Sequence, residues 1–247
     1  MDFITYLQNY NDLAVALSGG VDSSYLLYAV KKAGVRCKAY TVKSQFIPLF
    51  ELDDAIHIAK FLNVPHEILD INVLDCDDIV NNSSNRCYYC KHHVFSLLCK
   101  EAKRDGFTII ADGTNASDNI DDRPGIRAIR ELSVVSPLRD YGLKKSDIRT
   151  LSQKANLFTW NKPSYACLAT RFQEGETITR NRLVDLELAE SYLFSLGFID
   201  FRVRLQGNVA KIQVPEHQMT MIIAYRESII NYFKKIFDDI VLDLEPR

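Results

Sequence analysis

Residues 18–24 read SGGVDSS and connect a short apolar run at residues 12–17 (DLAVAL) to an amphipathic run at residues 25–34 (YLLYAVKKAG). The apolar run predicts a β-strand, and the helical spacing with a terminal glycine predicts a helix after the loop. Two adjacent glycines permit close backbone approach, and the amides at a helix start form a cradle for negatively charged oxygens. This strand–loop–helix unit therefore predicts a phosphate site.

The residues of this loop distinguish it from two common nucleotide loops. No lysine follows the glycines, unlike in loops ending in GK[ST], and the glycines do not follow the pattern GxGxxG. A carboxylate inside an anion cradle is unfavourable unless a cation bridges it to the phosphates, so Asp22 predicts a magnesium ion. A tight turn that only requires small residues is the alternative. The candidate ligand-binding residues are Ser18, Gly19, Gly20, Asp22, Ser23 and Ser24.

The alternation of strands and helices continues beyond the first unit. Further strands are predicted over residues 37–44, 66–72, 107–115 and 134–138, with helices over residues 52–63 and after residue 91. Such alternation favours an α/β fold with a parallel sheet, which binds ligands outside the carboxyl ends of its strands. The stretch DGTN comes at one such end, so Asp112 and Gly113 join the candidate site.

Beyond Trp160 the organisation changes. We expect a long helix over residues 179–196 and a hairpin over residues 201–214, whose turn is marked by Gly207-Asn208. The tail is expected to be helical with a short last strand. The sequence thus predicts a first domain over residues 1–165 and a small α/β domain over residues 175–247.

Composition limits the classes of protein to consider. The chain has 247 residues, is 47% hydrophobic and 25% charged, and contains only 10 Gly and 7 Pro, which excludes collagen-like and disordered proteins. Its net charge of −2 offers no general attraction for nucleic acid. No apolar run reaches the roughly 18 residues of a membrane span, and the first residues do not resemble a secretion signal. We therefore expect a cytoplasmic protein without a membrane partner.

The cysteines predict reduced thiols rather than disulfides, because no secretion signal accompanies them. Cys87 and Cys90 form a CxxC pair at a predicted helix start, where the helix dipole stabilises thiolate. Together with Cys167 they make three cysteines, one fewer than the irons of a 4Fe-4S cluster. One iron of such a cluster would have no protein ligand and could hold an additional sulfide. A zinc site completed by His92 or His93, or a metal-free redox pair, are the alternatives. The remaining cysteines are predicted to be structural: Cys37, Cys76 and Cys99.

Charged residues in the C-terminal part predict an anion site. Glu190 interrupts the apolar stripe of the long helix, which indicates either a solvated margin or a paired carboxylate. In the hairpin, Arg204 falls opposite Lys211 and Arg202 opposite Gln213. Like charges opposed across strands are unfavourable unless an anion lies between them. We therefore predict a phosphate site oriented by Glu190, with a solvated polar face as the alternative.

The loop SGGVDSS resembles the pyrophosphate loop of the ATP pyrophosphatases, which include asparagine, GMP and NAD synthetases and the tRNA thiolases. This resemblance implies that ATP is cleaved between its α and β phosphates, that the loop holds the pyrophosphate, and that AMP becomes attached to an oxygen of the substrate. It also implies that Asp22 helps to place magnesium and that the backbone of the second strand, around Tyr40 to Val42, contacts the adenine.

Five further segments narrow the resemblance to the LarE-type sulfur transferases of nickel-pincer nucleotide synthesis, over nearly the whole chain. They are DGTNASDNIDDRPGIRA, SPL with GLKKSDIR after it, KPSYACLATR, the AE of ELAESYLFSLGF, and FRVRLQGNVAKI. The resemblance implies adenylation of a carboxylate of a small pyridinium-type nucleotide, followed by replacement of the activated oxygen with sulfur. It also implies a sulfide or cysteine-derived sulfur donor, and a homo-oligomer in which the C-terminal domain contributes to substrate-phosphate binding and assembly.

By this resemblance, Arg171 binds the substrate carboxylate, and Arg202 and Arg204 hold the substrate phosphate. Cys167 matches a cysteine whose sulfur some members sacrifice, but the CxxC pair favours a cluster. Gln213 departs from the family pattern and leaves the nucleotide substrate open. A tRNA thiolase and a non-catalytic nucleotide or iron–sulfur sensor are the alternative functions. Four residues that follow the fourth strand are weaker candidates for the substrate site, with helix capping as the alternative: Asp121, Asp122, Arg123 and Arg127.

Overall fold

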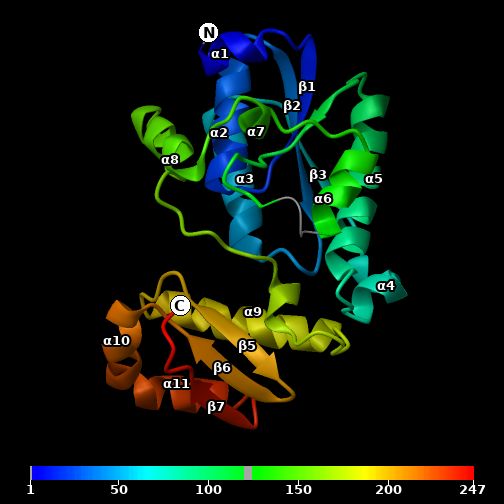
Figure 1. Cartoon of the computed structure of the whole chain (residues 1–247). Coiled ribbons are helices and arrows are strands. Elements are labelled where there is room, and N and C mark those ends of the chain that lie inside the picture. Colours follow the sequence, from blue (N-terminus) through cyan, green and yellow to red (C-terminus); the bar gives the residue numbers. More distant parts are fainter. Residues whose placement is uncertain (1, 120–123) are drawn as a thin grey trace. The chain divides into compact units, whose positions relative to one another are not determined.

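The computed structural model describes residues 2–119 and 124–247. The chain divides into two compact units (Figure 1). The first comprises Met1–Val73 and Asn85–Lys162, and the second comprises Leu74–Ser84 and Pro163–Arg247. Residues 74–84, expected in the first domain, belong to the second unit because the amide of Gly175 donates to Asn82 O at 2.9 Å and the amide of Ile178 to Val80 O at 2.9 Å.

The first unit is built on a four-stranded parallel sheet in the order β3-β2-β1-β4, which confirms the predicted α/β class. Its strands are β1 (Asp12–Ala16), β2 (Arg36–Lys43), β3 (His66–Asp70) and β4 (Ile110–Ala111). Its helices are α1 (Phe3–Leu7), α2 (Val21–Lys32), α3 (Leu49–Phe61), α5 (Arg86–Arg104), α6 (Pro124–Glu131), α7 (Pro137–Asp140) and α8 (Lys145–Lys154).

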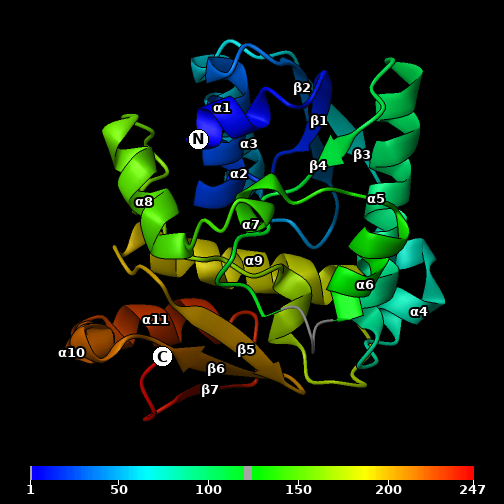
Figure 2. The same ribbon diagram turned by 45° about the horizontal axis from the view of Figure 1, so that its top comes forward.

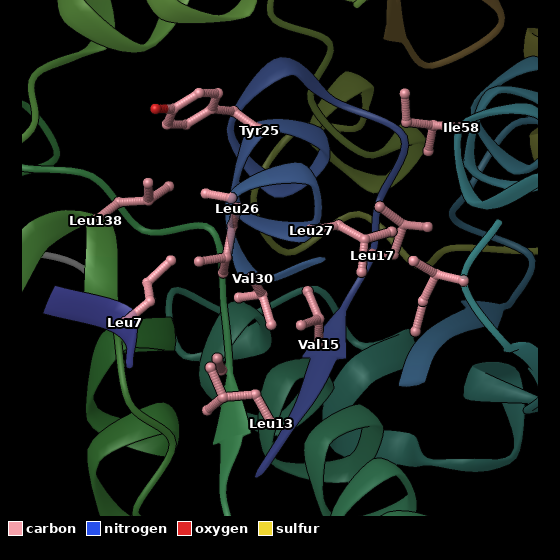
Figure 3. Packing of buried hydrophobic residues seen from close by; sticks show 14 of the residues in the cluster. Leu7, Leu13, Val15, Leu17, Tyr25, Leu26, Leu27, Val30, Ile58 and Leu138 are labelled. Carbon is pink, nitrogen blue, oxygen red and sulfur yellow. The ribbon is translucent and has the colours of Figure 1, made fainter. Parts of the chain in front are cut away.

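Helices cover both faces of this sheet (Figure 2). On one face, Leu13 and Val15 of β1 pack with Leu26 and Val30 of α2 and with Ile58 of α3 (Figure 3). On the other face, side chains of α5 and α6 pack against Ala14 and Tyr40. Alternate β1 residues thus face opposite layers, and the sheet is buried on both sides, as parallel sheets are.

The predicted fifth strand over residues 134–138 is wrong. Val135 forms only an isolated parallel bridge with Ala111, and α7 begins at Pro137. Proline has no amide hydrogen for a ladder and is favoured in the first turn of a helix. The predicted strand over residues 107–115 shortens to β4, because the Asp112 carboxylate accepts hydrogen bonds from Thr114 and Ser136 and the chain turns there.

The second unit packs helices on a three-stranded sheet in the order β5-β6-β7. Its strands are β5 (Arg202–Gln206), β6 (Val209–Gln213) and β7 (Asp239–Leu242), and its helices are α4 (Asp77–Val80), the 3₁₀ helix η2 (Leu168–Arg171), α9 (Arg180–Ser195), α10 (Met219–Ala224) and α11 (Arg226–Phe233). The predicted hairpin register is confirmed: Arg204 pairs with Lys211 and Arg202 with Gln213. Short 3₁₀ helices span Val73–Asp75 and Glu216–Gln218. Within the described ranges, no helix has the length and apolar character required to span a membrane.

Candidate functional site

The glycine loop leaves the carboxyl end of β1 and leads into α2, as predicted, but α2 begins at Val21, four residues before the predicted start at residue 25. Its serines bond to each other: Ser23 Oγ lies 3.0 Å from Ser18 Oγ and accepts the Ser18 amide at 3.2 Å. Gly20 is the N-cap of α2. The first amides of a helix have no partner within the helix, so the start of α2 offers donors for an anion.

The glycines of the site allow backbone segments to approach one another. Gly19 has φ +74°, and a Cβ there would lie 2.5 Å from the carbonyl oxygen of Glu51 in α3. A Cβ at Gly113 would lie 2.8 Å from the amide nitrogen of Ser23. The loop is therefore in direct contact with α3, and the turn after β4 supports the first turn of α2. Close approach to α3 is thus one structural reason for Gly19.

Asp22 has one bound and one unsatisfied carboxylate oxygen. Oδ2 accepts a hydrogen bond from Lys145 Nζ at 2.5 Å, whereas Oδ1 is buried and has no hydrogen-bond partner in the described structure. The buried Ser24 hydroxyl likewise has no hydrogen-bond partner in the described structure. Burial raises the pKa of the Asp22 carboxyl more than the hydrogen bond from Lys145 lowers it. An unpaired carboxylate oxygen beside an anion cradle fits a magnesium ion.

Two other predicted residues of the nucleotide site, Asp112 and Tyr40, form hydrogen bonds within the sheet and its turns. Asp112 is buried and accepts from Ser136 Oγ at 2.7 Å, which places Gly113 against α2. Tyr40 is buried, its hydroxyl donates to Asp105 at 2.7 Å, and its carbonyl accepts the Leu17 amide at 2.8 Å. Because these groups of Tyr40 are used inside the first unit, an adenine contact by this residue stays a prediction.

The second unit contains a buried ion pair. Arg171 and Glu190 are 1% and 2% exposed, with Nε–Oε1 at 2.8 Å and Nη2–Oε2 at 3.1 Å. Glu190 Oε1 also accepts the amide of Val203 at 2.9 Å, and Tyr165 donates its hydroxyl to Oε2. Burial acts to lower the pKa of Arg171, but hydrogen bonding and charge from Glu190 outweigh it and raise that pKa. Glu190 is therefore paired, and the solvated alternative is wrong.

Arginines hold the segment around Cys167. Arg171 Nη1 donates to Ala166 O at 3.0 Å, and Arg202 Nη2 donates to Ser164 O at 2.6 Å. The Tyr165 ring lies 4.6 Å from the guanidinium of Arg171 and 5.0 Å from that of Arg202. Burial, with the charges of Arg171 and Arg247, lowers the pKa of Arg202 to about 10. Arg202 thus contributes mainly positive charge and loop support, because it is only 5% exposed.

Arg204 is exposed and belongs to a polar network across β5 and β6. It donates from Nε to Gln213 Oε1 at 2.6 Å and from Nη1 to Thr170 O at 3.0 Å. The Asp243 carboxylate accepts from both Gln213 at 2.7 Å and Lys211 at 2.7 Å. Asp243 therefore neutralises Lys211, one of the two opposed cations of the hairpin. In the described ranges, Arg204 has only neutral hydrogen-bond acceptors.

The cysteines are divided between the two units. Cys87 and Cys90 lie three residues apart in the first turn of α5, which confirms the predicted helix start, and Arg86 Nη2 lies 3.2 Å from Cys87 Sγ. Cys167 is the N-cap of η2 in the second unit. No group of three His, Cys, Asp or Glu side chains that could hold a metal occurs in the part of the chain described.

The weaker candidates for the substrate site follow the fourth strand in the sequence. Asp121, Asp122 and Arg123 lie outside the described residues, and the Arg127 guanidinium stacks 4.0 Å from the Tyr88 ring centre.

Comparisons with known proteins agree with these features. The family model of the queuosine biosynthesis protein QueC matches residues 13–85. An uncharacterized protein of Synechocystis is 36% identical over 83% of this chain and 77% of its own length. The pyridinium-3,5-bisthiocarboxylic acid mononucleotide synthase of Lactiplantibacillus plantarum is 30% identical over 98% of this chain and 88% of its own length. This chain belongs to the LarE-type sulfur transferase family.

The tRNA thiolases are more distant from this LarE-type chain. A tRNA-specific 2-thiouridylase of Thermoanaerobacter is 27% identical over 62% of this chain and 53% of its own length. Both relationships fit the parallel sheet and glycine loop of a PP-loop core.

Sequence reasoning missed several polar partners in this LarE-type chain. Lys145 and Lys162 lie in segments noted for the resemblance, but neither was assigned a contact. A signal for Lys145 exists, because a cation in the first turn of a helix opposes the helix dipole and indicates another partner. For Tyr165 and Asp243 no such local signal exists.

Proposed function

We propose that this protein is an ATP-dependent sulfur transferase acting on a carboxylate of a small pyridinium-type nucleotide. The carboxylate oxygen attacks the α phosphorus of ATP and pyrophosphate leaves; sulfide then attacks the acyl carbon and AMP leaves, which produces a thiocarboxylate. The unsatisfied Asp22 oxygen beside the start of α2 is the observation that carries the proposal.

The first half of the reaction uses residues of the first unit. The amides at the start of α2, together with Ser18 and Ser23, would hold the two outer phosphates, and Asp22 Oδ1 would bind the metal. A bound magnesium ion would supply charge neutralisation of the departing pyrophosphate. Lys145, held on Asp22 at 2.5 Å, carries a positive charge at the same place. Oriented donors of this kind stabilise charge that develops on a leaving group.

The second half uses residues of the second unit. Arg204 is exposed and has only neutral acceptors in the described structure, so it is the arginine best placed to hold the substrate phosphate. Arg202 and Glu190 would support it, and Arg171 would act on the substrate carboxylate through positive charge near Cys167. A homo-oligomer stays a prediction, to be checked by light scattering.

Three thiolates would hold the centre from which sulfide is delivered. Cys87 and Cys90 suit a shared metal centre because residues three apart lie on one helical face. A 4Fe-4S cluster held by these two and Cys167 would supply an iron with an open position for sulfide. Alternatively, the Cys167 thiolate attacks the acyl carbon and AMP leaves; loss of the α-hydrogen of this residue then breaks its Cβ–Sγ bond, which releases the thiocarboxylate and leaves dehydroalanine. Intact mass after one turnover distinguishes these routes: a loss of one hydrogen sulfide assigns the sulfur to Cys167.

Asp22→Asn should reduce AMP and pyrophosphate formation by about 100-fold, because one charge-stabilising contact of the transition state is lost. Both products are measured by anion-exchange chromatography with the pyridinium nucleotide as acceptor. Asp53→Asn, on the exposed side of α3, is the control and should retain the wild-type rate. Formation of ADP by the wild-type protein would contradict the proposal.

Replacing Cys87, Cys90 or Cys167 individually by serine should remove most of the iron from protein purified without oxygen. Each thiolate is one of only three protein ligands in the proposed cluster. Iron per chain and the visible absorption spectrum are the measurements, and Cys76→Ser is the control. Equal iron content in the wild type and in Cys167→Ser would exclude Cys167 as a ligand and limit the centre to the CxxC pair.

A tRNA thiolase is the second candidate, favoured by the similarity to the 2-thiouridylase over 62% of this chain. It requires tight binding of tRNA at physiological salt. We expect no such binding, because the chain has a net charge of −2. A filter-binding titration at two salt concentrations tests this.

A further inference from the structure

Lys162 contacts the glycine loop directly. Its Nζ lies 3.3 Å from the carbonyl oxygen of Gly19, 2.5 Å from Asp54 Oδ2 and 2.8 Å from Glu51 Oε1. The side chain is 15% exposed. All these residues belong to the first unit. One ammonium group therefore joins the loop to two carboxylates of α3.

The contact lies where the loop and α3 already meet. A Cβ on Gly19 would be 2.5 Å from Glu51 O and 2.9 Å from the amide nitrogen of Ala55. The peptide that follows Gly19 thus has little room, and Lys162 binds its carbonyl oxygen. An anion cradle requires amide hydrogens that face the ligand and carbonyl oxygens that face away. A cation on the Gly19 carbonyl stabilises that orientation.

Lys162 is itself held in place. Arg149 donates from Nη2 to Lys162 O at 2.8 Å and from Nη1 to Trp160 O at 2.9 Å. Arg149 lies on α8, the helix whose first residue, Lys145, binds Asp22. The same helix therefore positions both lysines that contact the glycine loop and its helix.

The charges around Lys162 affect an incoming triphosphate. Glu51 and Asp54 place two negative charges next to the loop, and their side chains are 13% and 28% exposed. Partly buried charges are less screened by solvent than exposed ones, so without Lys162 these carboxylates would repel the phosphates. Lys162 reduces this local charge from −2 to −1.

We propose that Lys162 is a positioning residue for pyrophosphate: it holds the Gly19 carbonyl away from the cradle and compensates the carboxylates of α3. The inference rests on the proposed function, because it assumes that the loop binds the outer phosphates of ATP. Lys162 does not touch the reacting phosphorus in this assignment, so it affects binding of the phosphates more than the chemical step.

Binding of inorganic pyrophosphate with magnesium, measured by calorimetry, tests this inference together with steady-state kinetics. Lys162→Met should raise the Kd for pyrophosphate and the KM for ATP about 10-fold or more, with kcat within about 3-fold of wild type, as expected for loss of uniform binding. Lys162→Arg should restore most of the affinity. Asp54→Asn in the Lys162→Met background should restore part of it, since one repulsive charge is removed.

The controls separate this role from a purely structural one. Lys60→Met changes an exposed lysine of α3 and should leave both constants at wild-type values. A fall in kcat with unchanged KM and pyrophosphate affinity would overturn the inference, because that pattern indicates loss of folded enzyme. If Lys162→Met does not fold, the Asp54→Asn double variant and Lys162→Arg carry the test, and wild-type affinity in the double variant would overturn the proposed hold on the Gly19 carbonyl, because charge compensation alone would then explain Lys162. Failure of the wild-type protein to bind pyrophosphate would instead overturn the proposed function and the inference with it.

Discussion

Glu190→Ala should lower the free energy of unfolding by about 3–5 kcal/mol, because it leaves the guanidinium of Arg171 buried without its carboxylate. Arg171 is 1% exposed and is bound by both oxygens of Glu190. The variant also removes the acceptor for the Val203 amide at the start of β5. Urea denaturation followed by circular dichroism measures the effect, and loss of sulfur transfer should accompany it because this pair supports the segment around Cys167.

Two comparisons make this prediction specific to the buried pair. Glu227→Ala also removes a glutamate carboxylate, but an exposed one in the first turn of α11. It should lower the free energy of unfolding by at most about 1 kcal/mol. The double variant Arg171→Met with Glu190→Leu should recover much of the stability but none of the activity, because apolar side chains can replace a buried ion pair. A loss below about 1 kcal/mol for Glu190→Ala would show that the pair is solvated in solution.

Gly19→Ala should abolish ATP cleavage, with a loss of about 100-fold or more. A β-carbon at this position meets the α3 backbone at 2.5 Å, and the backbone has φ +74°, where side chains are strained. The loop must therefore move, and the amides of the phosphate cradle move with it. The rate of AMP and pyrophosphate formation is the measurement, with circular dichroism to show that the first unit remains folded.

Gly34→Ala is the matched control for this substitution. Gly34 follows α2 with the same φ of +74°, but a Cβ there has no atom within 4 Å. The backbone strain is thus the same and the steric conflict is absent, so we expect about 1–2 kcal/mol of destabilisation and near-wild-type activity. Equal activity losses in both variants would indicate that backbone strain, rather than contact with α3, explains the glycine at position 19.

The local features of this protein could be predicted from the sequence. The strand, glycine loop and first helix follow from apolar periodicity and two adjacent glycines, and the hairpin register follows from Gly207-Asn208 and a period of two. Each depends on interactions between residues a few positions apart. The strand predicted over residues 134–138 failed because a single bridge and the following Pro137 outweighed its β-type composition.

Glu190 shows what a local sequence pattern can predict and what it cannot. Its position in the apolar stripe of α9 indicated a paired or marginal carboxylate, and the periodicity of a single helix cannot say which. The structure supplies the partner, Arg171, from the preceding 3₁₀ helix η2, together with the Tyr165 hydroxyl. In the hairpin, Asp243 pairs with Lys211, one of the two opposed cations, and a phosphate on Arg204 stays a proposal.

The sequence by itself determined the α/β class, the glycine loop with its carboxylate, and the hairpin register that places Arg204 opposite Lys211. Only the tertiary structure decided which charges meet. Lys145 reaches Asp22 across 123 residues of sequence, and Lys162 reaches Gly19 across 143. The physical reason is that periodicity and turn chemistry act over a few residues, whereas the pairing of buried charges depends on distances that exist only once helices have packed on the sheet.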